Sequence, residues 1–241
     1  MRTEYLENID LVSFDVWKTL IVPGPEEHGI KRAELIRDLL APTENVHFVH
    51  ELSVRVSREQ DALMDSTGVQ YGLTERIRGI YDLLPREKRV PTITDQVIEL
   101  LDSYQAGVIR QYPPKFLEKD LLDTLSQLRG QGLSLALISN TGYLAGRHML
   151  PVLKDIGILE YLEYTLFSDE VGVAKPNHKI FDALKGKSGL EGQRIVHVGD
   201  NYLADYRGAI SAGLKSLHLS RNTTEDSVKI PNLRTLVGNW V

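Results

Sequence analysis

Five polar residues that lie far apart in the sequence together carry the groups that phosphoryl transfer needs. Asp15 can act as a carboxylate nucleophile, the Ser139 hydroxyl can donate a hydrogen bond to a phosphoryl oxygen, and Lys175 can supply positive charge there. Asp200 and Asp205 add two carboxylates, and three carboxylates at one place suit a hard cation such as Mg²⁺. Taken singly, each residue fits an ordinary turn, cap or loop, so the chemical interpretation depends on their meeting.

The predicted secondary structure brings these residues to one edge of a sheet. Asp15, Ser139 and Asp200 each end or follow an apolar run, and Lys175 follows a fourth run after a short loop. Because the carboxyl ends of parallel strands meet at one crevice, we expect these side chains to lie together. We also expect Ser139 to sit where a helix begins, with backbone N–H groups that favour an anion. The predicted strands cover residues 11–15, 133–139, 164–167, 194–198 and 214–219.

The order of the predicted elements indicates the fold class and the domain organisation. After residue 113 the strands alternate with helical patterns, which predicts an α/β fold with a doubly wound parallel sheet, a Rossmannoid core. The preceding stretch shows only helical spacing, over roughly four helices. We therefore predict a core domain of residues 1–22 and 113–241 and an all-helical domain of residues 23–112 inserted into it. The predicted helices cover residues 30–40, 46–64, 74–84, 97–108, 116–128, 143–153, 179–184 and 204–212.

Composition narrows the classes of partner. The chain has 241 residues, 42% of them apolar and 25% charged, and its net charge is −5. Without a basic run, nucleic acid and anionic membranes are not the expected partners, and no apolar run approaches the length of a bilayer span. The chain lacks cysteine, and acidic residues occupy the start where a signal peptide needs an apolar core. We expect a cytoplasmic protein that acts on a small molecule.

The four segments resemble the four motifs of the haloacid dehalogenase superfamily, most of whose members transfer phosphoryl groups through an aspartyl intermediate. The first motif resembles residues 14–20 (FDVWKTL) and the second resembles residues 137–140 (LISN). The third resembles residues 167–176 (FSDEVGVAKP), and the fourth resembles residues 198–205 (VGDNYLAD). The inserted helices resemble the cap domain that, in this superfamily, closes over the site and selects substrates.

The resemblance implies a role for each residue of the site. Asp15 is the expected nucleophile, and Thr19, Ser139, Asn140 and Lys175 are expected to bind the phosphoryl group, with Thr19 also orienting Asp15 or securing the turn. The expected cofactor is Mg²⁺. Its ligands would be Asp15, the backbone carbonyl of Trp17, and Asp200, with Asp205 binding directly or through water.

Trp17 departs from the pattern of the phosphatases that the chain resembles. Those enzymes carry a second Asp two residues after the nucleophile, which acts as general acid and then as general base. An indole N–H cannot shuttle a proton at neutral pH, and losing such help typically costs about 10²–10⁴-fold in rate. We therefore expect acyl and aryl phosphates to be better substrates than alkyl phosphates, unless a His or carboxylate of the cap replaces the missing acid.

Two alternatives remain open at this stage. The first is a 2-haloacid dehalogenase: those members of the superfamily also carry an aromatic residue at this position and need no metal. A full resemblance to them would, however, require Ser at the position of Asp200. The other alternative is a catalytically weakened protein that binds a phosphorylated ligand or a partner protein. The metal dependence of turnover separates the three functions: the phosphatase would need Mg²⁺, the dehalogenase would need no metal, and the binding protein would show no efficient turnover.

The remaining notable residues are interpreted as structural. His47 and His50 lie one helical turn apart, and we read them as a helix face rather than a metal pair. His197 is expected to be a hydrogen-bonded core residue, and His178 to start a helix. Tyr71, Arg76 and Arg78 are read as an ordinary polar helix face, and Trp240 as a packing or interface residue.

Overall fold

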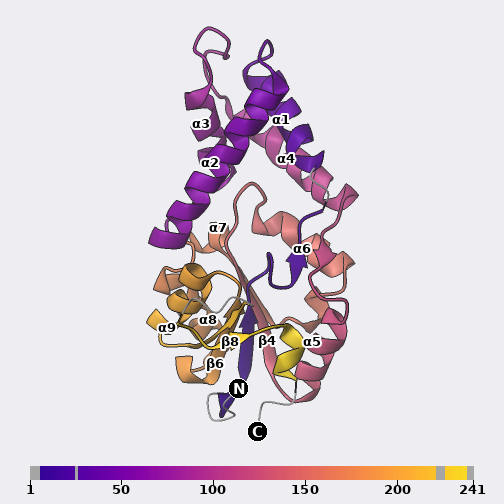
Figure 1. The fold of residues 1–241 in the computed structure, drawn as a ribbon, viewed down its shortest axis with the longest axis vertical. Helices are drawn as coiled ribbons and strands as arrows, with labels where there is room; N and C mark the ends of the chain where they lie inside the picture. The colour runs from indigo at the N-terminus through magenta and orange to yellow at the C-terminus, as the bar shows by residue number, and fades with distance from the viewer. Residues whose placement is uncertain (1–5, 25–26, 221–225, 238–241) are drawn as a thin grey trace.

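The computed structural model describes residues 6–24, 27–220 and 226–237. Trp240 therefore lies outside the described residues. So do residues 222–225 and 238–241, for which the sequence predicts no helix or strand. A sheet with helices on both faces forms the lower part of the molecule, and a bundle of helices lies above it (Figure 1). Among the described helices, none combines the length and the apolar character needed to cross a bilayer.

A six-stranded sheet, in which each neighbouring pair is parallel, forms the centre of the lower part. Its strand order is β5-β4-β1-β6-β7-β8. β1 lies between β4 and β6, so that Phe14 pairs with Leu137 on one side and with Val198 on the other. This register places the ends of the three strands level with one another. The strands are β1 (Leu11–Phe14), β4 (Ser134–Ser139), β5 (Tyr164–Phe167), β6 (Ile195–Gly199), β7 (Lys215–Leu219) and β8 (Lys229–Ile230).

Apolar residues on both faces of the sheet explain why helices cover both sides. One face carries Val12 and Phe14 and packs against α5 (Leu121–Gly130) and α6 (Gly146–Asp155). The opposite face carries Leu11 and Ile138 and packs against α8 (His178–Ser188) and α9 (Gly208–Ser211). Strands that are buried on both faces read as continuous apolar runs, which is the pattern in the sequence. The predicted doubly wound α/β fold is confirmed.

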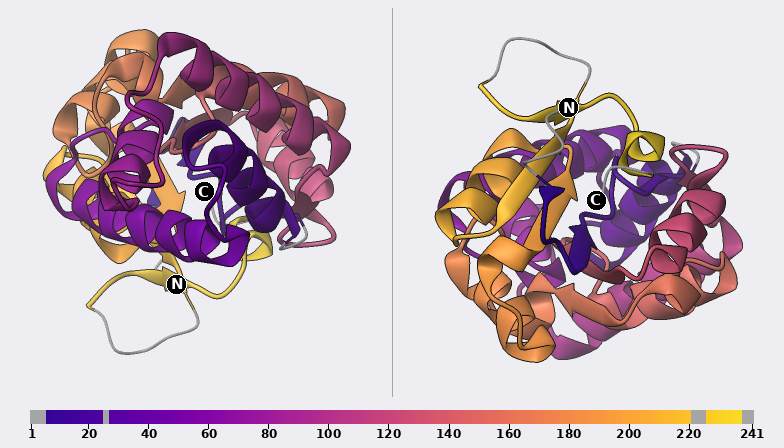
Figure 2. Two further views of the ribbon diagram at one scale, coloured as in Figure 1. Left: turned by 90° about the horizontal axis from the view of Figure 1, so that it is seen from above. Right: turned by 90° about the horizontal axis from the view of Figure 1, so that it is seen from below.

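The four helices of the inserted segment pack around an apolar cluster of their own. They are α1 (Glu27–Leu40), α2 (Val46–Thr67), α3 (Leu73–Leu83) and α4 (Asp95–Gln111). Ile36, Val49, Ile77 and Leu101, one from each helix, are fully buried or nearly so in this cluster. We call α1–α4 the helical bundle. The view from above shows the bundle lying across the end of the sheet (Figure 2).

Helix-capping residues define where the long helix α2 starts and stops. The side chain of Asn45 accepts a hydrogen bond from the backbone N–H of His47 at 2.8 Å, which satisfies one free donor of the first turn. Gly68 ends the helix in the left-handed conformation, with φ at 72°, and its N–H donates to the carbonyl of Met64. Left-handed backbone favours glycine because it has no Cβ.

Several predicted boundaries differ from the structure. The helix expected over 116–128 begins only at Leu121, because Lys115–Phe116 forms β3, which pairs antiparallel with β2 (Ile21–Val22). The short loop expected between the strand over 164–167 and Lys175 contains a helical turn, α7 (Ser168–Val171). The helix expected over 204–212 is a π-helical segment (Tyr202–Arg207) followed by α9. The stretch after residue 222 adds β8 and a 3₁₀ turn (Leu233–Leu236), which pairing and packing form without a local periodic pattern.

Candidate functional site

Asp15 lies at the carboxyl edge of the central strand. Its backbone N–H donates to the carbonyl of Val198 at 2.9 Å, which continues the pairing of β1 with β6 by one residue. A tight turn follows, closed by hydrogen bonds from the N–H groups of Leu20 and Ile21 to the carbonyl of Val16. The Asp15 side chain is thereby held at the end of the sheet, with the residue only 8% exposed.

Lys175 reaches Asp15 from the loop after α7, which the second predicted motif holds in place. The Asn140 side chain accepts from the backbone N–H of Lys175 at 2.7 Å and donates to its carbonyl at 3.0 Å. The ammonium group lies 2.7 Å from a carboxylate oxygen of Asp15 and 2.7 Å from one of Asp205. It also donates to the carbonyl of Ile138 at 2.7 Å. All its donors are therefore directed into the site, and the residue is 1% exposed.

Asp205 is fixed by a buried network that the sequence did not reveal. One oxygen faces Lys175 and lies 3.3 Å from Nε2 of His197, and the other accepts from the backbone N–H of Asn201 at 2.9 Å. Nδ1 of His197 lies 2.9 Å from the hydroxyl of Ser13. The expectation that His197 is a hydrogen-bonded core residue is confirmed, and the structure adds that it supports a residue of the site.

The charges of the site shift the pKa values of its members in opposite directions. Burial raises the pKa of Asp15 to about 7, although the positive charge of Lys175 opposes the shift. Burial alone would raise the pKa of Asp205, but Lys175 and the hydrogen bond from His197 hold it below its usual range. Despite burial, Asp15 and Asp205 raise the pKa of Lys175. Burial lowers the pKa of His197, so its imidazole is neutral at pH 7.

The three carboxylates predicted to hold a cation lie together. Asp15, Asp200 and Asp205 each offer an oxygen, and these atoms lie within 4.8 Å of one another. Among the described residues, Asp200 forms no ion pair, whereas both oxygens of Asp205 already have hydrogen-bond donors. Burial raises the pKa of Asp200, and the Asp205 charge raises it further. Repulsion of this kind is relieved by a hard cation, so the donor set fits Mg²⁺.

The other predicted site residues lie nearby, with differences from expectation. Ser139 is buried at the end of β4, but α6 begins only at Gly146, so the expectation that Ser139 sits at a helix start is wrong. The intervening chain turns away from the sheet, and the N–H of Gly146 is occupied by the carboxylate of Asp169 at 3.2 Å. Thr19 is fully buried, and its hydroxyl has no hydrogen-bond partner among the described residues.

Thr141 is a further residue of this region that sequence reasoning missed. Its hydroxyl donates to Asp169 at 2.9 Å, and its N–H donates to the hydroxyl of Ser168 at 2.8 Å. Gln70, which follows α2, donates to the carbonyl of Thr141 at 3.0 Å. A polar residue after a strand is common, and no spacing in the sequence marks this one as a junction between the core and the bundle.

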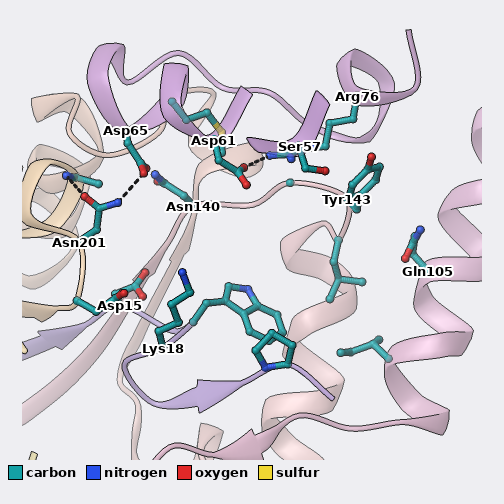
Figure 3. Close-up of a pocket in the computed structure, with 18 of the residues that line it drawn as sticks. Asp15, Lys18, Ser57, Asp61, Asp65, Arg76, Gln105, Asn140, Tyr143 and Asn201 are labelled. Carbon is teal, nitrogen blue, oxygen red and sulfur yellow. Dashed lines mark hydrogen bonds and ion pairs between the residues drawn. The ribbon is translucent and has the colours of Figure 1, made fainter. Parts of the chain in front are cut away.

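A cavity of about 620 Å³ lies between the sheet edge and the helical bundle. Core residues line one part of it and bundle residues line the other (Figure 3). The core contributes Asp15, Trp17, Asn140, Lys175, Asn201 and both acids of the fourth motif, whereas the bundle contributes Arg32, Ser57, Asp61, Asp65, Arg76 and Gln105.

Arg76 of the bundle differs from expectation. Arg76 is only 2% exposed and donates to Asp61 at 2.5 Å, so its interpretation as part of an ordinary polar helix face is wrong. Its long side chain is instead buried and paired with the carboxylate of Asp61, a contact that helical spacing along the sequence does not indicate. Among the described residues, Asp15, Asp200 and Asp205 form the group of acids that could hold a metal ion, and His47 and His50 are not part of it. His178 begins α8, as expected.

Comparisons with known proteins give relatives whose names are those of hydrolases. The family model for haloacid dehalogenase-like hydrolases matches residues 9–213. Haloacid dehalogenase-like hydrolase domain-containing protein 3 of Homo sapiens is 37% identical over 94 residues, which is 39% of this chain and 36% of that protein. Glyceraldehyde 3-phosphate phosphatase of Methanopyrus kandleri is 32% identical over 125 residues, 50% of this chain and 52% of that protein. The matched region thus spans about a third to a half of these relatives.

Solved structures share the fold over nearly the whole chain. A HAD phosphatase from Thermococcus onnurineus aligns with a TM-score of 0.66 at 22% identity, covering 96% of this chain and 99% of its own. An L-2-haloacid dehalogenase from Xanthobacter autotrophicus aligns with a TM-score of 0.60 at 14% identity, covering 95% and 96%. At these identities the likeness establishes the architecture alone. The family model, which matches residues 9–213, shows that this chain belongs to the haloacid dehalogenase-like hydrolases.

Proposed function

We propose that this hydrolase is a Mg²⁺-dependent phosphatase that acts on a small phosphorylated metabolite through an aspartyl phosphate on Asp15. The observation that carries the proposal is the position of the Asp15 carboxylate, at the sheet edge beside Lys175 and two further acids, in a cavity open to a small molecule. The phosphatase names of relatives such as the Methanopyrus kandleri protein support the same reaction class.

The first step in this mechanism is attack on phosphorus by a carboxylate oxygen of Asp15. The bond from phosphorus to the leaving oxygen breaks, and its electron pair remains on that oxygen, which takes up a proton. Water then attacks the phosphorus of the aspartyl phosphate, gives up a proton, and the Asp15 carboxylate is restored. Lys175 offsets the charge of the phosphoryl oxygens and of Asp15, and its own pKa is raised, so it remains charged throughout.

Asp15, Asp200 and the backbone carbonyl of Trp17 are the residues that would hold Mg²⁺. Because its two oxygens already accept hydrogen bonds, Asp205 is suited to an outer position that contacts the cation through water. The cation, when bound, neutralises the phosphoryl oxygens and favours the ionised form of Asp15, which burial alone disfavours.

The proton for the leaving oxygen needs a donor, since Trp17 cannot supply it. Within the proposal we assign this role to Asp65 of α2, which lines the cavity and accepts a hydrogen bond from Asn201 at 2.6 Å. Burial raises the pKa of Asp65, and a carboxyl group with a raised pKa holds its proton more readily and is better suited to act as a general acid. The neighbouring Asp61 is paired with Arg76 and is less suited. Figure 3 shows both acids extending from α2 toward the cavity.

The electrostatics of the site disfavour the alternative of 2-haloacid dehalogenation. That reaction places a substrate carboxylate beside Asp15, where Asp200 and Asp205 would repel it in the absence of a cation. The other alternative, binding without turnover, is disfavoured because the nucleophile Asp15, Lys175 and Asp205 are all present and in contact.

Hydrolysis of an acyl, an aryl and an alkyl phosphate, each with Mg²⁺ and with chelator, tests the proposed function. We expect turnover that requires Mg²⁺ and is abolished in Asp15→Asn, because the amide is a poor nucleophile. A matched control is Asp38→Asn, which removes an exposed carboxylate of α1 whose ion pair among the described residues is with the adjacent Arg37. Turnover of a 2-haloacid in chelator, with none of the phosphates hydrolysed, would instead establish the dehalogenase.

A further inference from the structure

Arg32 of α1 lines the same cavity as Asp15 and carries a charge that no described carboxylate neutralises. Its guanidinium lies over the ring of Tyr143, 4.0 Å from the ring centroid. Its Nε atom is buried and has no hydrogen-bond partner among the described residues. Arginine stays charged in proteins, and a partly buried guanidinium that no described carboxylate neutralises favours a negatively charged partner. The arrangement therefore suits an anion that enters the cavity.

Arg76 of α3 brings a second guanidinium near the same aromatic ring. It lies 5.3 Å from the centroid of the same Tyr143 ring and is held by Asp61 and by the carbonyl of Tyr71. The chain after β4 passes close to this guanidinium, so that a Cβ on Gly142 would lie 2.7 Å from it. Two guanidinium groups and one carboxylate leave a net positive charge at this end of the cavity.

Gln105 of α4 supplies a second unpartnered donor. The residue is 7% exposed, its Nε2 has no hydrogen-bond partner among the described residues, and it lines the cavity. A buried amide donor left without a partner is unfavourable, so a ligand that accepts its hydrogen bond is favoured. Figure 3 shows Gln105, Tyr143 and Arg76 together at one side of the cavity, with Asp15 at the other.

We propose that Arg32, Arg76 and Gln105, with the Tyr143 ring as a platform, form a second anion-binding subsite at the bundle side of the cavity. Resting on the phosphatase function proposed above, this inference gives the substrate class: a phosphate ester whose other end carries a carboxylate or a second phosphate. Guanidinium groups and an amide present planar N–H donors that match the oxygens of either anion. The phosphoryl group at Asp15 and the distal anion at Arg32 would then be held at opposite sides of one cavity.

A series of substrates that differ only at the distal end tests the inference. We would compare three kinds of substrate in the wild type and in Arg32→Gln. They are ω-phosphoalkanoates of two to six carbons, the matching alkanediol bisphosphates, and the matching alkanediol monophosphates, whose distal end is an uncharged hydroxyl. We expect Arg32→Gln to lower kcat/KM for the anion-ended substrates about 10- to 100-fold, mainly through KM, because a charge-assisted hydrogen bond is lost. For the hydroxyl-ended substrates, kcat/KM should change less than about twofold, since their distal end makes no such bond.

Two further variants separate binding from damage to the fold. Gln105→Glu places a negative charge in the subsite. It should weaken the binding of the anion-ended substrates and leave the binding of the hydroxyl-ended ones nearly unchanged. Arg55→Gln is the matched control, because Arg55 lies on the exposed surface of α2 and pairs with Glu59. The preferred chain length in the series, and the choice between carboxylate and phosphate, identify the distal group.

Binding of the non-hydrolysable ω-phosphonoalkanoates, measured by calorimetry, separates this inference from the proposed function. If no phosphate is hydrolysed but these ligands bind the wild type and lose about 10-fold or more in affinity in Arg32→Gln, the subsite stands and the phosphatase proposal fails. If phosphates are hydrolysed but wild type and Arg32→Gln show no preference for anion-ended substrates, the subsite is overturned and the phosphatase proposal stands.

Discussion

At the scale of single residues, the replacement of the usual acid by Trp17 leads to a prediction about Asp65. Asp65→Asn should lower kcat for an alkyl phosphate by about 10²–10⁴-fold, because the leaving alkoxide then has no proton donor. An acyl phosphate, whose leaving group needs little protonation, should be slowed much less. Steady-state kinetics on both substrates, with the pH profile of kcat, provide the measurement.

A rescue variant distinguishes proton transfer from a structural role for Asp65. Adding Trp17→Asp to the Asp65→Asn protein should restore part of the alkyl phosphatase activity, because a carboxyl group returns near the leaving oxygen. Glu59→Gln, on the exposed face of the same helix, is the control that should leave kinetics unchanged. Equal losses on the alkyl and acyl substrates would show that Asp65 takes no part in proton transfer.

At the scale of elements, the end of α2 meets the loop that carries Lys175. The carbonyl of Gly68 accepts from the N–H of Ala174 at 2.9 Å, and a Cβ on Gly68 would lie 2.6 Å from the Cβ of Asn177. Gly68→Ala should therefore combine the strain of a left-handed residue with a steric clash, and lower the free energy of unfolding by about 2–5 kcal/mol. Because Ala174 precedes Lys175, kcat should also fall.

Gly189 at the end of α8 is a matched control for this substitution. It has the same left-handed conformation, with φ at 68°, but a Cβ there would meet nothing within 4 Å. Gly189→Ala should lower the free energy of unfolding by only about 1–2 kcal/mol and leave kcat unchanged. Urea unfolding and kinetics of the two variants, side by side, measure the contribution of the contact. Similar results for both would mean that Gly68 ends a helix and does nothing more.

Sequence reasoning predicted the elements that carry Asp15 and Ser139 because these elements depend on local pattern. Strands buried on both faces are continuous apolar runs, and the four helices of the bundle follow a 3.6-residue spacing. The short β3 is different: its pairing with Ile21 joins segments nearly a hundred positions apart, and two residues carry no period. The start of α6 was predicted too early, since the segment after Ser139 is shaped by Asp169, which lies beyond the next strand.

The same distinction holds for the candidate site. Asp15, Lys175 and the two acids of the fourth motif were found because strand ends and motif spacing place them together. His197 and Thr141 take part through side-chain contacts across neighbouring strands and loops, which no spacing along the chain records. Arg32 was missed entirely, because its importance lies in a ring from the core and in a cavity that exists only when the bundle and the core are assembled.

At the scale of the whole molecule, two sets of polar contacts join the bundle to the core at different helices. In one, Asp65 of the bundle accepts from Asn201 of the core. In the other, Asp102 of α4 lies 2.7 Å from a guanidinium nitrogen of Arg147 and 2.8 Å from Nε2 of His148, both in α6. Although burial opposes the shift, the hydrogen bonds from His148 and Arg147 lower the pKa of Asp102. The ionised carboxylate is therefore favoured in the folded protein.

This shift predicts how the stability of the assembled molecule depends on pH. Asp102 has its ordinary pKa of about 3.9 in the unfolded chain and a lower pKa in the folded one, so its contribution is complete above about pH 5 and is lost as the pH falls through the folded value. Asp102→Asn should lower the free energy of unfolding by about 1 kcal/mol or less at pH 7, since the group is partly exposed. Urea unfolding of wild type and variant at pH 7, 5 and 3.5 should show the difference shrinking at the lowest pH. A difference that stays constant over this range would mean that Asp102 joins α4 to α6 through packing rather than through its charge.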